Sequence, residues 1–319
     1  MRAFTVPSHS SPAFSKTWTL PPLGPGEIRI NVSACGLNFA DLLMIEGSYQ
    51  ETPALPFVPG LEICGIVEQV DVYVSEFEIG DRIVAFCGSG GLAEKVNVHA
   101  SRCRLVPVAM NDEIAAGFQI AYGTSHLALT RRARLQPGER LVVLGAAGGV
   151  GLTAVEIGRA LGAEVIAVAR GADKLDVARK AGADHTIDAS SEDLRGALKA
   201  LGGIDVVYDA VGGALGEAAL RALRPEGRFL AVGFASGDVP KPKLNHLLVK
   251  NIDVLGFYWG GYLTFAADAL TESLGELMHW HAEGRIAPHI SHVLPFEKTP
   301  EALDLLKTRR ATGKVVVTL

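Results

Sequence analysis

The stretch from Arg140 to Arg170 constrains the fold of this 319-residue chain more than any other part. It begins with a short apolar run rich in branched residues, Leu141 to Leu144, which is typical of a strand buried on both faces of a parallel sheet. A glycine-rich turn follows, and apolar residues then recur at helical spacing as far as Gly162. A second apolar run, Val165 to Ala169, comes next. The pattern predicts a strand, a tight turn, a helix and a second strand.

The glycine-rich turn predicts a dinucleotide site, because small residues let a pyrophosphate approach the N–H groups at the start of the helix. The usual G-x-G-x-x-G fingerprint is altered: Ala146 stands at the first glycine position, and Gly148 and Gly151 hold the other two. The alternative is a glycine-rich loop that only packs a helix on a sheet, but the strand and helix context favours nucleotide binding. The expected contacts in the turn are Ala147, Gly148, Gly149 and Val150.

The end of the second strand indicates which dinucleotide is bound. An NAD site places Asp or Glu there to bind the ribose 2′-hydroxyl, whereas this chain has Arg170 and then Lys174. Cationic side chains favour a 2′-phosphate, so we expect NADPH. In the alternative interpretation both are solvated surface charges, partly neutralised by Asp173 and Asp176.

Further apolar runs separated by helical stretches follow, at His185–Ile187, Asp205–Ala210, Arg228–Gly233 and Ile252–Phe257. Six strands alternating with helices predict an α/β fold with a doubly wound parallel sheet, the Rossmann fold. Its ligands bind outside the carboxyl ends of the strands, at the switch point between the first and fourth. Residues just past those ends are expected cofactor contacts: Val211, Gly233, Phe234, Phe257, Tyr258 and Trp259.

The rest of the chain predicts a second kind of unit. Residues 1–118 carry short apolar runs punctuated by glycine and proline, which predict an all-β, barrel-like domain with one short helix that ends at Gly47. We assign residues 119–260 to the dinucleotide-binding domain and expect residues 261–319 to return to the first. That return is predicted to contain a long helix, Thr264–Glu283, a strand, His289–Leu294, a helix, Pro300–Lys307, and a last strand, Lys314–Leu319.

Composition limits the class of function. A formal net charge of −5 provides no basic face, which argues against nucleic acid or an anionic membrane as the main partner. No apolar run has the length of a signal peptide or a membrane span, so we expect a cytoplasmic protein. The scattered cysteines are expected to be buried hydrophobes in a reducing compartment: Cys35, Cys64, Cys87 and Cys103.

Several motifs resemble the quinone oxidoreductase (zeta-crystallin-like) branch of the medium-chain dehydrogenase/reductase superfamily, in order along nearly the whole chain. They are PGEIRINVSACGLNFADLLMIEGSY, LPFVPGLEICGIVEQV, GDRIVAFCGSGGLAEKV, GAAGGVG and VVYDAVGG. The resemblance implies a GroES-like β-barrel catalytic domain that is split in sequence around the Rossmann domain. It also implies an active site in the cleft between them and a homodimer that pairs the sixth Rossmann strands.

The resemblance further predicts a zinc-independent enzyme. Zinc-dependent members bind the catalytic metal through a Cys, the His of G-H-E and a second Cys, at positions held here by Asn38, Leu61 and a residue near Ala116. These side chains cannot replace thiolates and an imidazole on Zn²⁺. The nearby Asp41 and Glu62 look like a general acid–base pair, but the resemblance implies chiefly structural roles. The histidines at 279, 281, 289 and 292 are more typical of surface or packed residues than of a metal site.

Hydride transfer to a quinone or an enone develops negative charge on the acceptor oxygen, which needs stabilisation. The sequence offers neutral donors at Asn38, Tyr49 and Tyr258, which are the predicted catalytic residues. Such donors suit an electron-poor acceptor, whereas an unactivated ketone needs a metal or a strong acid. The resemblance also places Asn38 close to the nicotinamide, although the residue could serve only as a helix cap. Two more cofactor contacts are expected, Lys314 and Thr124, the latter replacing a threonine that relatives carry at the position of Ile120.

The predicted function is therefore the NADPH-dependent, metal-independent reduction of quinones or other activated carbonyl-conjugated acceptors. One alternative is an enoyl-thioester reductase acting on an acyl-CoA, which needs a basic patch for the CoA phosphates. Another is an NADPH-binding protein with little turnover.

Overall fold

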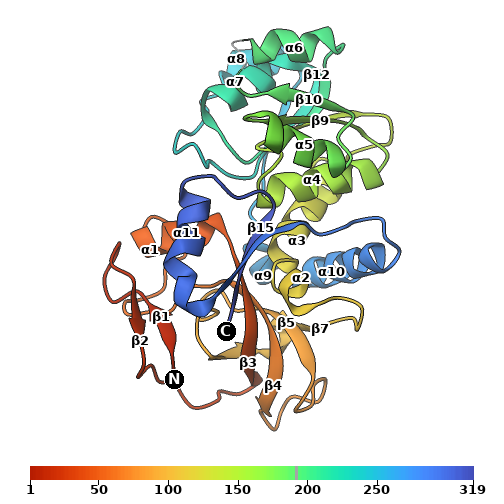
Figure 1. Ribbon diagram of the computed structural model, residues 1–319. Helices are drawn as coiled ribbons and strands as arrows, with labels where there is room; N and C mark the ends of the chain where they lie inside the picture. The colour runs from red at the N-terminus through yellow and green to blue at the C-terminus, as the bar shows by residue number, and fades with distance from the viewer. Residues whose placement is uncertain (191–192) are drawn as a thin grey trace. The chain divides into compact units, whose positions relative to one another are not determined.

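The computed structural model describes residues 1–190 and 193–319. Its contacts divide the chain into two compact units. The split unit comprises residues 1–120 and 289–319, and the continuous unit comprises residues 121–288. The end of the chain belongs to the same unit as its beginning, and Figure 1 shows the last helix and strand in blue among the N-terminal elements of the split unit.

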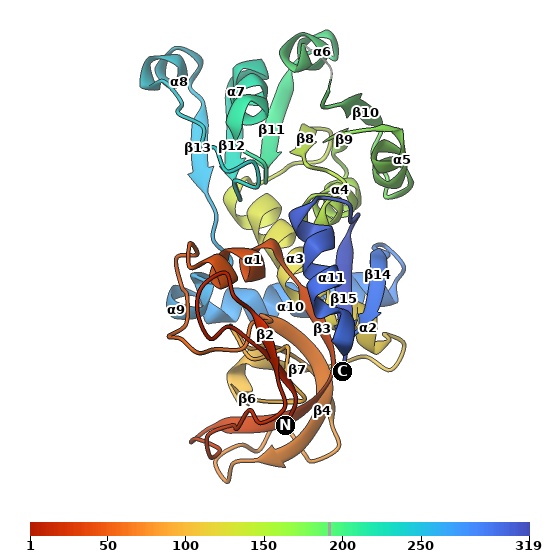
Figure 2. The ribbon, with the colours of Figure 1, turned by 60° about the vertical axis from the view of Figure 1, so that its left-hand side comes forward.

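The continuous unit is built on a six-stranded parallel sheet of order β10-β9-β8-β11-β12-β13. Its strands are β8 (Arg140–Leu144), β9 (Glu164–Ala169), β10 (His185–Asp188), β11 (Ile204–Asp209), β12 (Leu223–Ala231) and β13 (Asp253–Gly256). The strand order reverses between β8 and β11, as a doubly wound sheet requires, so the predicted fold class is confirmed. Figure 2 shows this sheet from β13 across to β9.

Helices connect these strands because two parallel strands need a crossover connection, which is usually an α-helix. The helices of the unit are α3 (Gln119–Leu127), η2 (Ala128–Arg132), α4 (Gly149–Ala160), α5 (Ala172–Lys180), α6 (Leu194–Ala200), α7 (Gly213–Ala222), α8 (Leu244–Lys250), α9 (Tyr262–Phe265) and α10 (Ala267–Ala282). Helix α4 buries Leu152, Val155 and Ile157, and its chain turns at Gly162, at φ 82°, as the sequence predicts.

The second crossing between the units lies at residues 288 and 289, whereas the sequence analysis expects it near residue 261. The reason is that α9 and α10 bury their apolar faces in the continuous unit. Trp280 packs edge-to-face on the imidazole of His126, with ring centroids 5.2 Å apart. The predicted helix over 264–283 is also interrupted at Ala266, whose φ of −157° and ψ of 54° separate α9 from α10.

The split unit is built on a mostly antiparallel sheet of order β14-β15-β3-β4-β5-β7, with β6 also paired to β3. Its strands are β3 (Glu27–Leu37), β4 (Glu62–Val70), β5 (Arg82–Phe86), β6 (Lys95–His99), β7 (Cys103–Leu105), β14 (Ile290–Pro295) and β15 (Lys314–Thr318), with a separate hairpin of β1 (Ala3–Thr5) and β2 (Ala13–Ser15). Its helices are α1 (Phe39–Glu46), η1 (Ala100–Arg102), α2 (Asp112–Ala116), η3 (Phe296–Lys298) and α11 (Thr299–Lys307). Strand β15 pairs with β3, with Val315 opposite Leu37, so the start of β15 lies at the carboxyl end of β3 (Figure 2).

Two predictions about the chain's chemistry can be compared with these units. Cys35, Cys64 and Cys103 are buried as expected, whereas Cys87 is only half-buried, which corrects the prediction for that residue. No helix within residues 1–190 and 193–319 is long and apolar enough to span a membrane.

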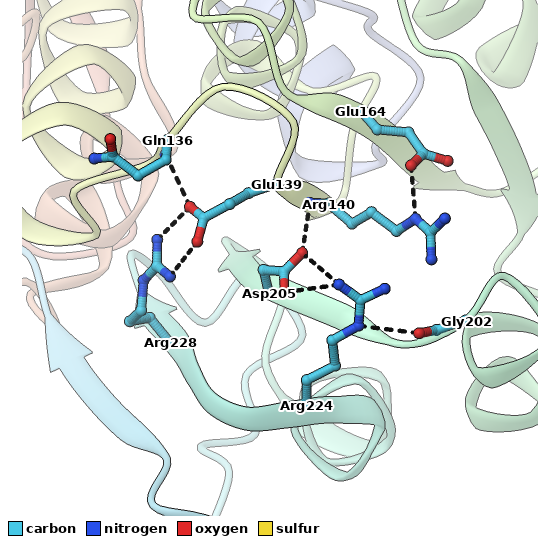
Figure 3. Close-up of polar contacts among 8 residues, drawn as sticks. All are labelled: Gln136, Glu139, Arg140, Glu164, Gly202, Asp205, Arg224 and Arg228. Carbon is cyan, nitrogen blue, oxygen red and sulfur yellow. Dashed lines mark hydrogen bonds and ion pairs between the residues drawn. The ribbon is translucent and has the colours of Figure 1, made fainter.

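Ion pairs tie the strands of the parallel sheet together at their amino ends (Figure 3). The guanidinium of Arg228 binds both carboxylate oxygens of Glu139 at 2.6 Å and also donates to the Ala133 carbonyl oxygen at 2.9 Å. Arg224 binds the Asp205 carboxylate at 3.0 Å and 3.1 Å, and Asp205 also accepts the backbone N–H of Arg140. The Arg228 side chain is 14% exposed and that of Arg224 is 40% exposed, so the first pair is the stronger.

We expect Arg228→Ala to destabilise the protein by about 2–3 kcal/mol, since it leaves a largely buried carboxylate without its charged donors. Thermal unfolding should then shift down by roughly 4–12 °C, measured by circular dichroism. Arg224→Ala is the matched control and should cost below about 1 kcal/mol. Equal losses in the two variants would contradict the ranking of the pairs.

Candidate active site

The turn before α4 is built for close backbone approach. Gly145 has φ 72°, in the left-handed region that favours glycine, and its carbonyl oxygen accepts the Gly148 N–H at 2.9 Å. A Cβ added at Gly151 would lie 2.1 Å from that same oxygen, so glycine is sterically required there. No side chain in the described part of the chain caps the helix at Gly148. The N–H groups of its first turn, among them those of Gly149 and Val150, therefore form a site for an anion.

Arg170 and Lys174 lie at the carboxyl end of β9, as predicted. Arg170 directly follows the strand and is exposed, and Lys174 is half-buried in the first turn of α5. Asp176, which the alternative interpretation offers as a neutralising charge, binds Lys180 at 2.7 Å and Arg179 at 3.4 Å. Its charge is thus directed to the last turn of α5.

Asp209, at the end of β11, is a site residue that the sequence reasoning missed. Its Oδ1 accepts the backbone N–H groups of Val211 and Gly212, both at 2.8 Å, and its carbonyl oxygen accepts those of Val232 and Gly233 at 2.9 Å and 3.2 Å. The side chain is fully buried, and burial raises the pKa of its carboxyl above the ordinary value. Asp209 therefore holds both loops that carry the expected contacts Val211, Gly233 and the exposed Phe234. A charged residue at the end of an apolar strand was the available signal.

The segment after β13 packs on helix α3 within the continuous unit. Trp259 is buried, and its indole Nε1 would lie 2.5 Å from a Cβ added at Gly123, so the ring rests on the backbone of α3. Thr124, the next residue of α3, is buried as well. Phe257 is buried and Tyr258 is half-buried. The fold thus gathers four expected contacts, Thr124, Phe257, Tyr258 and Trp259.

In the split unit, Asn38 follows β3 and begins helix α1. Its backbone N–H donates to Asp41 Oδ2 at 2.8 Å, and Asp41 Oδ1 accepts the Gly60 N–H at 2.9 Å. Burial raises the pKa of the Asp41 carboxyl to about 6, although these two N–H donors oppose the shift. Both oxygens of Asp41 are occupied in holding backbone, so this carboxylate fixes the start of α1.

The side chain of Asn38 belongs to a buried polar cluster with Glu62 and Lys314. The Lys314 ammonium donates to Leu37 O, Asn38 Oδ1 and Glu62 Oε1, each at 2.8 Å. Asn38 Nδ2 donates to Glu62 Oε1 at 3.0 Å and to Gly36 O at 3.2 Å. Both amide hydrogens of Asn38 and all three ammonium hydrogens of Lys314 therefore have acceptors inside the unit.

The remaining predicted residue, Tyr49, is half-buried in the turn after α1, and its carbonyl oxygen accepts the Thr52 hydroxyl at 2.9 Å. The predicted site residues are thus divided between the units. Asn38, Tyr49 and Lys314 lie in the split unit, and all the others lie in the continuous unit. Within the described ranges, no group of three or more His, Cys, Asp or Glu side chains is placed to hold a metal ion.

Comparison with known proteins identifies the family. The model of the alcohol dehydrogenase GroES-like domain matches residues 24–108, and that of the zinc-binding dehydrogenases matches residues 149–274. Quinone oxidoreductase-like protein 2 of Bos taurus is 38% identical over 302 residues, which cover 93% of this chain and 86% of the relative.

Two solved structures extend this likeness to the fold. The quinone oxidoreductase of Thermus thermophilus, determined alone and with NADPH, superposes with a TM-score of 0.87 at 33% identity, covering 100% of both chains. The quinone oxidoreductase of Escherichia coli in complex with NADPH gives a TM-score of 0.92 at 30% identity, again over 100% of both chains. The chain belongs to the zinc-free quinone oxidoreductase branch of the medium-chain dehydrogenase/reductase superfamily.

Proposed function

We propose that this protein is an NADPH-dependent reductase of quinones or other acceptors conjugated to a carbonyl. The observation that carries the proposal is the uncapped glycine turn before α4, at the switch point of the parallel sheet. There the Gly151 position admits no Cβ, and first-turn N–H groups are left for a pyrophosphate. The residues present therefore fit a dinucleotide.

The choice of NADPH over NADH is supported by charge. Arg170 carries an exposed guanidinium at the end of β9, and Lys174 follows in the first turn of α5. Arg170 directly follows β9, where an NAD site would place an Asp or Glu to bind the ribose 2′-hydroxyl. The relatives crystallised with NADPH support the same choice.

The residues around Asn38 limit the chemistry of the acceptor. When bound, NADPH supplies a hydride, and the acceptor oxygen then gains negative charge. The Asn38 amide hydrogens are shared with Gly36 O and Glu62. We propose that other neutral donors, hydroxyl and backbone N–H groups, stabilise that oxygen, and the sequence analysis predicts Tyr49 and Tyr258 as the hydroxyl donors. Neutral donors of this kind suit quinones and enones, which are electron-poor before reaction.

Zinc does not fit the donor set of the split unit. The positions of the zinc ligands carry Asn38, Leu61 and a residue near Ala116, and the Lys314 ammonium binds Asn38 and Glu62. Zinc sites are built from thiolate, imidazole and carboxylate ligands, and an ammonium offers only donors. We therefore propose that the reaction proceeds without zinc.

We also propose a homodimer formed through the edge of the parallel sheet. Strand β13 is the last of its sheet, and the preceding helix α8 buries none of its residues. Leu244, Leu248 and Val249 are 76–78% exposed, and Val254 on β13 is 39% exposed. An apolar edge of this kind is covered most simply by a second copy of the same edge.

The proposed activity is tested by following NADPH absorbance with 9,10-phenanthrenequinone, a simple enone and crotonyl-CoA in parallel. We expect turnover with the quinone and none with crotonyl-CoA. Rapid oxidation by crotonyl-CoA would favour the enoyl-thioester reductase instead, and nucleotide binding without oxidation would favour a binding protein.

Gly151→Ala should abolish the binding of NADPH, because the added Cβ meets a carbonyl oxygen. Gly275→Ala on α10 is the matched control, because its Cβ meets nothing within 4 Å.

The cofactor preference is tested with the double variant Arg170→Ala/Lys174→Ala. Loss of charge-assisted bonds to a 2′-phosphate should raise the dissociation constant of NADPH about tenfold or more per contact. The dissociation constant of NADH should stay within about twofold of the wild-type value. Nucleotide fluorescence titration measures both dissociation constants. Arg179→Ala/Lys180→Ala is the control, since it removes the same charge from the far end of α5. Equal losses for the two nucleotides would place the phosphate elsewhere.

The proposed dimer is tested by light scattering after gel filtration. The wild-type chain should elute with twice the mass of the monomer, 33.7 kDa, and Leu248→Glu should yield monomers because it buries a charge in the interface. Leu105→Glu, on an exposed residue of the split unit, should remain dimeric. A monomeric wild-type protein would refute the proposal.

A further inference from the structure

Asn38, Glu62 and Lys314 form a buried cluster whose ion pair has no role in the proposed reaction. Lys314 and Glu62 are 6% and 1% exposed, and they form an ion pair at 2.8 Å. The second oxygen of Glu62 accepts the Ile120 N–H at 2.9 Å. Asn38 is held on both sides, with its oxygen bound to the ammonium and its nitrogen bound to Glu62. Rotation of this amide would break bonds to two charged groups.

The ammonium lies among the positions that hold zinc in other members of the superfamily. It binds residue 38 directly and binds Glu62, the neighbour of Leu61. A Cβ added at Gly117, next to Ala116, would lie 3.3 Å from the Lys314 side chain. Residues 38, 62 and 117 thus lie against the lysine, which brings a positive charge into the cluster where those members bring a metal.

We propose that Lys314 is the built-in cation of this site and a positioning residue for Asn38. The inference rests on the proposed function only for its kinetic test. Because its three hydrogens are engaged, Lys314 contributes nothing to the nucleotide phosphates, and its role passes through the orientation of the Asn38 amide. The Asn38 amide is then held in one fixed orientation.

Two interpretations of the ion pair make different predictions. A buried ion pair that serves only structure is replaced by neutral groups of similar volume at little cost, whereas removal of one partner leaves a destabilising buried charge. If the pair also positions Asn38, restoring stability with two neutral groups does not restore the reaction. The double variant Glu62→Gln/Lys314→Met therefore separates stability from positioning.

The kinetic test uses Lys314→Met, Lys314→Arg and Glu62→Gln/Lys314→Met in the full chain. We expect Lys314→Met to lower kcat about tenfold or more and to change the dissociation constant of NADPH by less than about threefold. The double variant should regain the wild-type melting temperature and keep the low kcat. Lys314→Arg, which keeps the charge, should recover most of the kcat. Lys298→Met, in an exposed pair with Glu301, is the matched control and should match the wild type.

Several outcomes would overturn the proposal. Wild-type kcat in the double variant would make the pair purely structural. If Lys314→Met weakens the binding of NADPH tenfold or more and leaves kcat unchanged, Lys314 is a nucleotide ligand. If the purified wild type binds one zinc ion per chain and Glu62→Gln loses it, the cation of this site is a metal and not the Lys314 ammonium. If Lys314→Met does not fold, the double variant alone decides the question.

A second readout does not depend on activity. In protein labelled with ¹⁵N-asparagine, the Asn38 side-chain amide is identified by its loss in Asn38→Ala. Its hydrogens should exchange slowly with solvent in the wild type and Lys314→Arg, and at least about tenfold faster in the double variant. Equal exchange in all three would overturn the proposal. If the wild type reduces no acceptor, the proposed function fails, and the exchange experiment still decides the role of Lys314.

Discussion

The close approach of backbone to backbone at a few glycines sets the geometry on which both units depend. In the continuous unit, Gly151 brings α4 so near Gly145 that a Cβ would lie 2.1 Å from the carbonyl oxygen. In the split unit, a Cβ at Gly36 would lie 2.3 Å from Ala116 O. The first contact places the start of a helix where it can receive a phosphate, and the second brings α2 against the end of β3.

The contact at Gly36 has a consequence for charge. It places the backbone of residues 116–117 over the end of β3, where Lys314 arrives at the start of β15. The ammonium then compensates Glu62 in a setting from which water is excluded, and three acceptors satisfy its hydrogens. Asp41, close by, is satisfied by backbone N–H groups instead. Two buried carboxylates in one unit are thus stabilised in different ways.

Asp209 shows the same principle in the continuous unit. One of its oxygens organises the loop after β11, and its backbone carbonyl holds the loop after β12. A Cβ added at Gly216 would lie 2.3 Å from its other oxygen, so α7 approaches the carboxyl closely. The edge of the sheet proposed to receive the nucleotide is therefore held by a residue that need not touch it.

The local pattern of the sequence was sufficient for the secondary structure and for the topology of the parallel sheet. Apolar runs of strand length, a helix that ends before Gly162 and a turn of small residues are properties of neighbouring residues, and each was confirmed. The break at Ala266 and the crossing at residues 288–289 differ from the continuous helix and the earlier boundary that the sequence predicts. They depend on where α9 and α10 bury their apolar faces, and periodicity does not specify the partner of a face.

By itself the sequence determined the fold class and the family resemblance, because these follow from short-range spacing and residue type. Only the tertiary structure decided which acceptors the Lys314 ammonium binds. The sequence predicted a cofactor contact, but the pairing of β15 with β3 places the ammonium on Asn38, 276 residues away, and on Glu62, 252 residues away. A lysine binds whichever acceptors the fold brings within reach, and no local sequence pattern predicts contacts between segments so far apart.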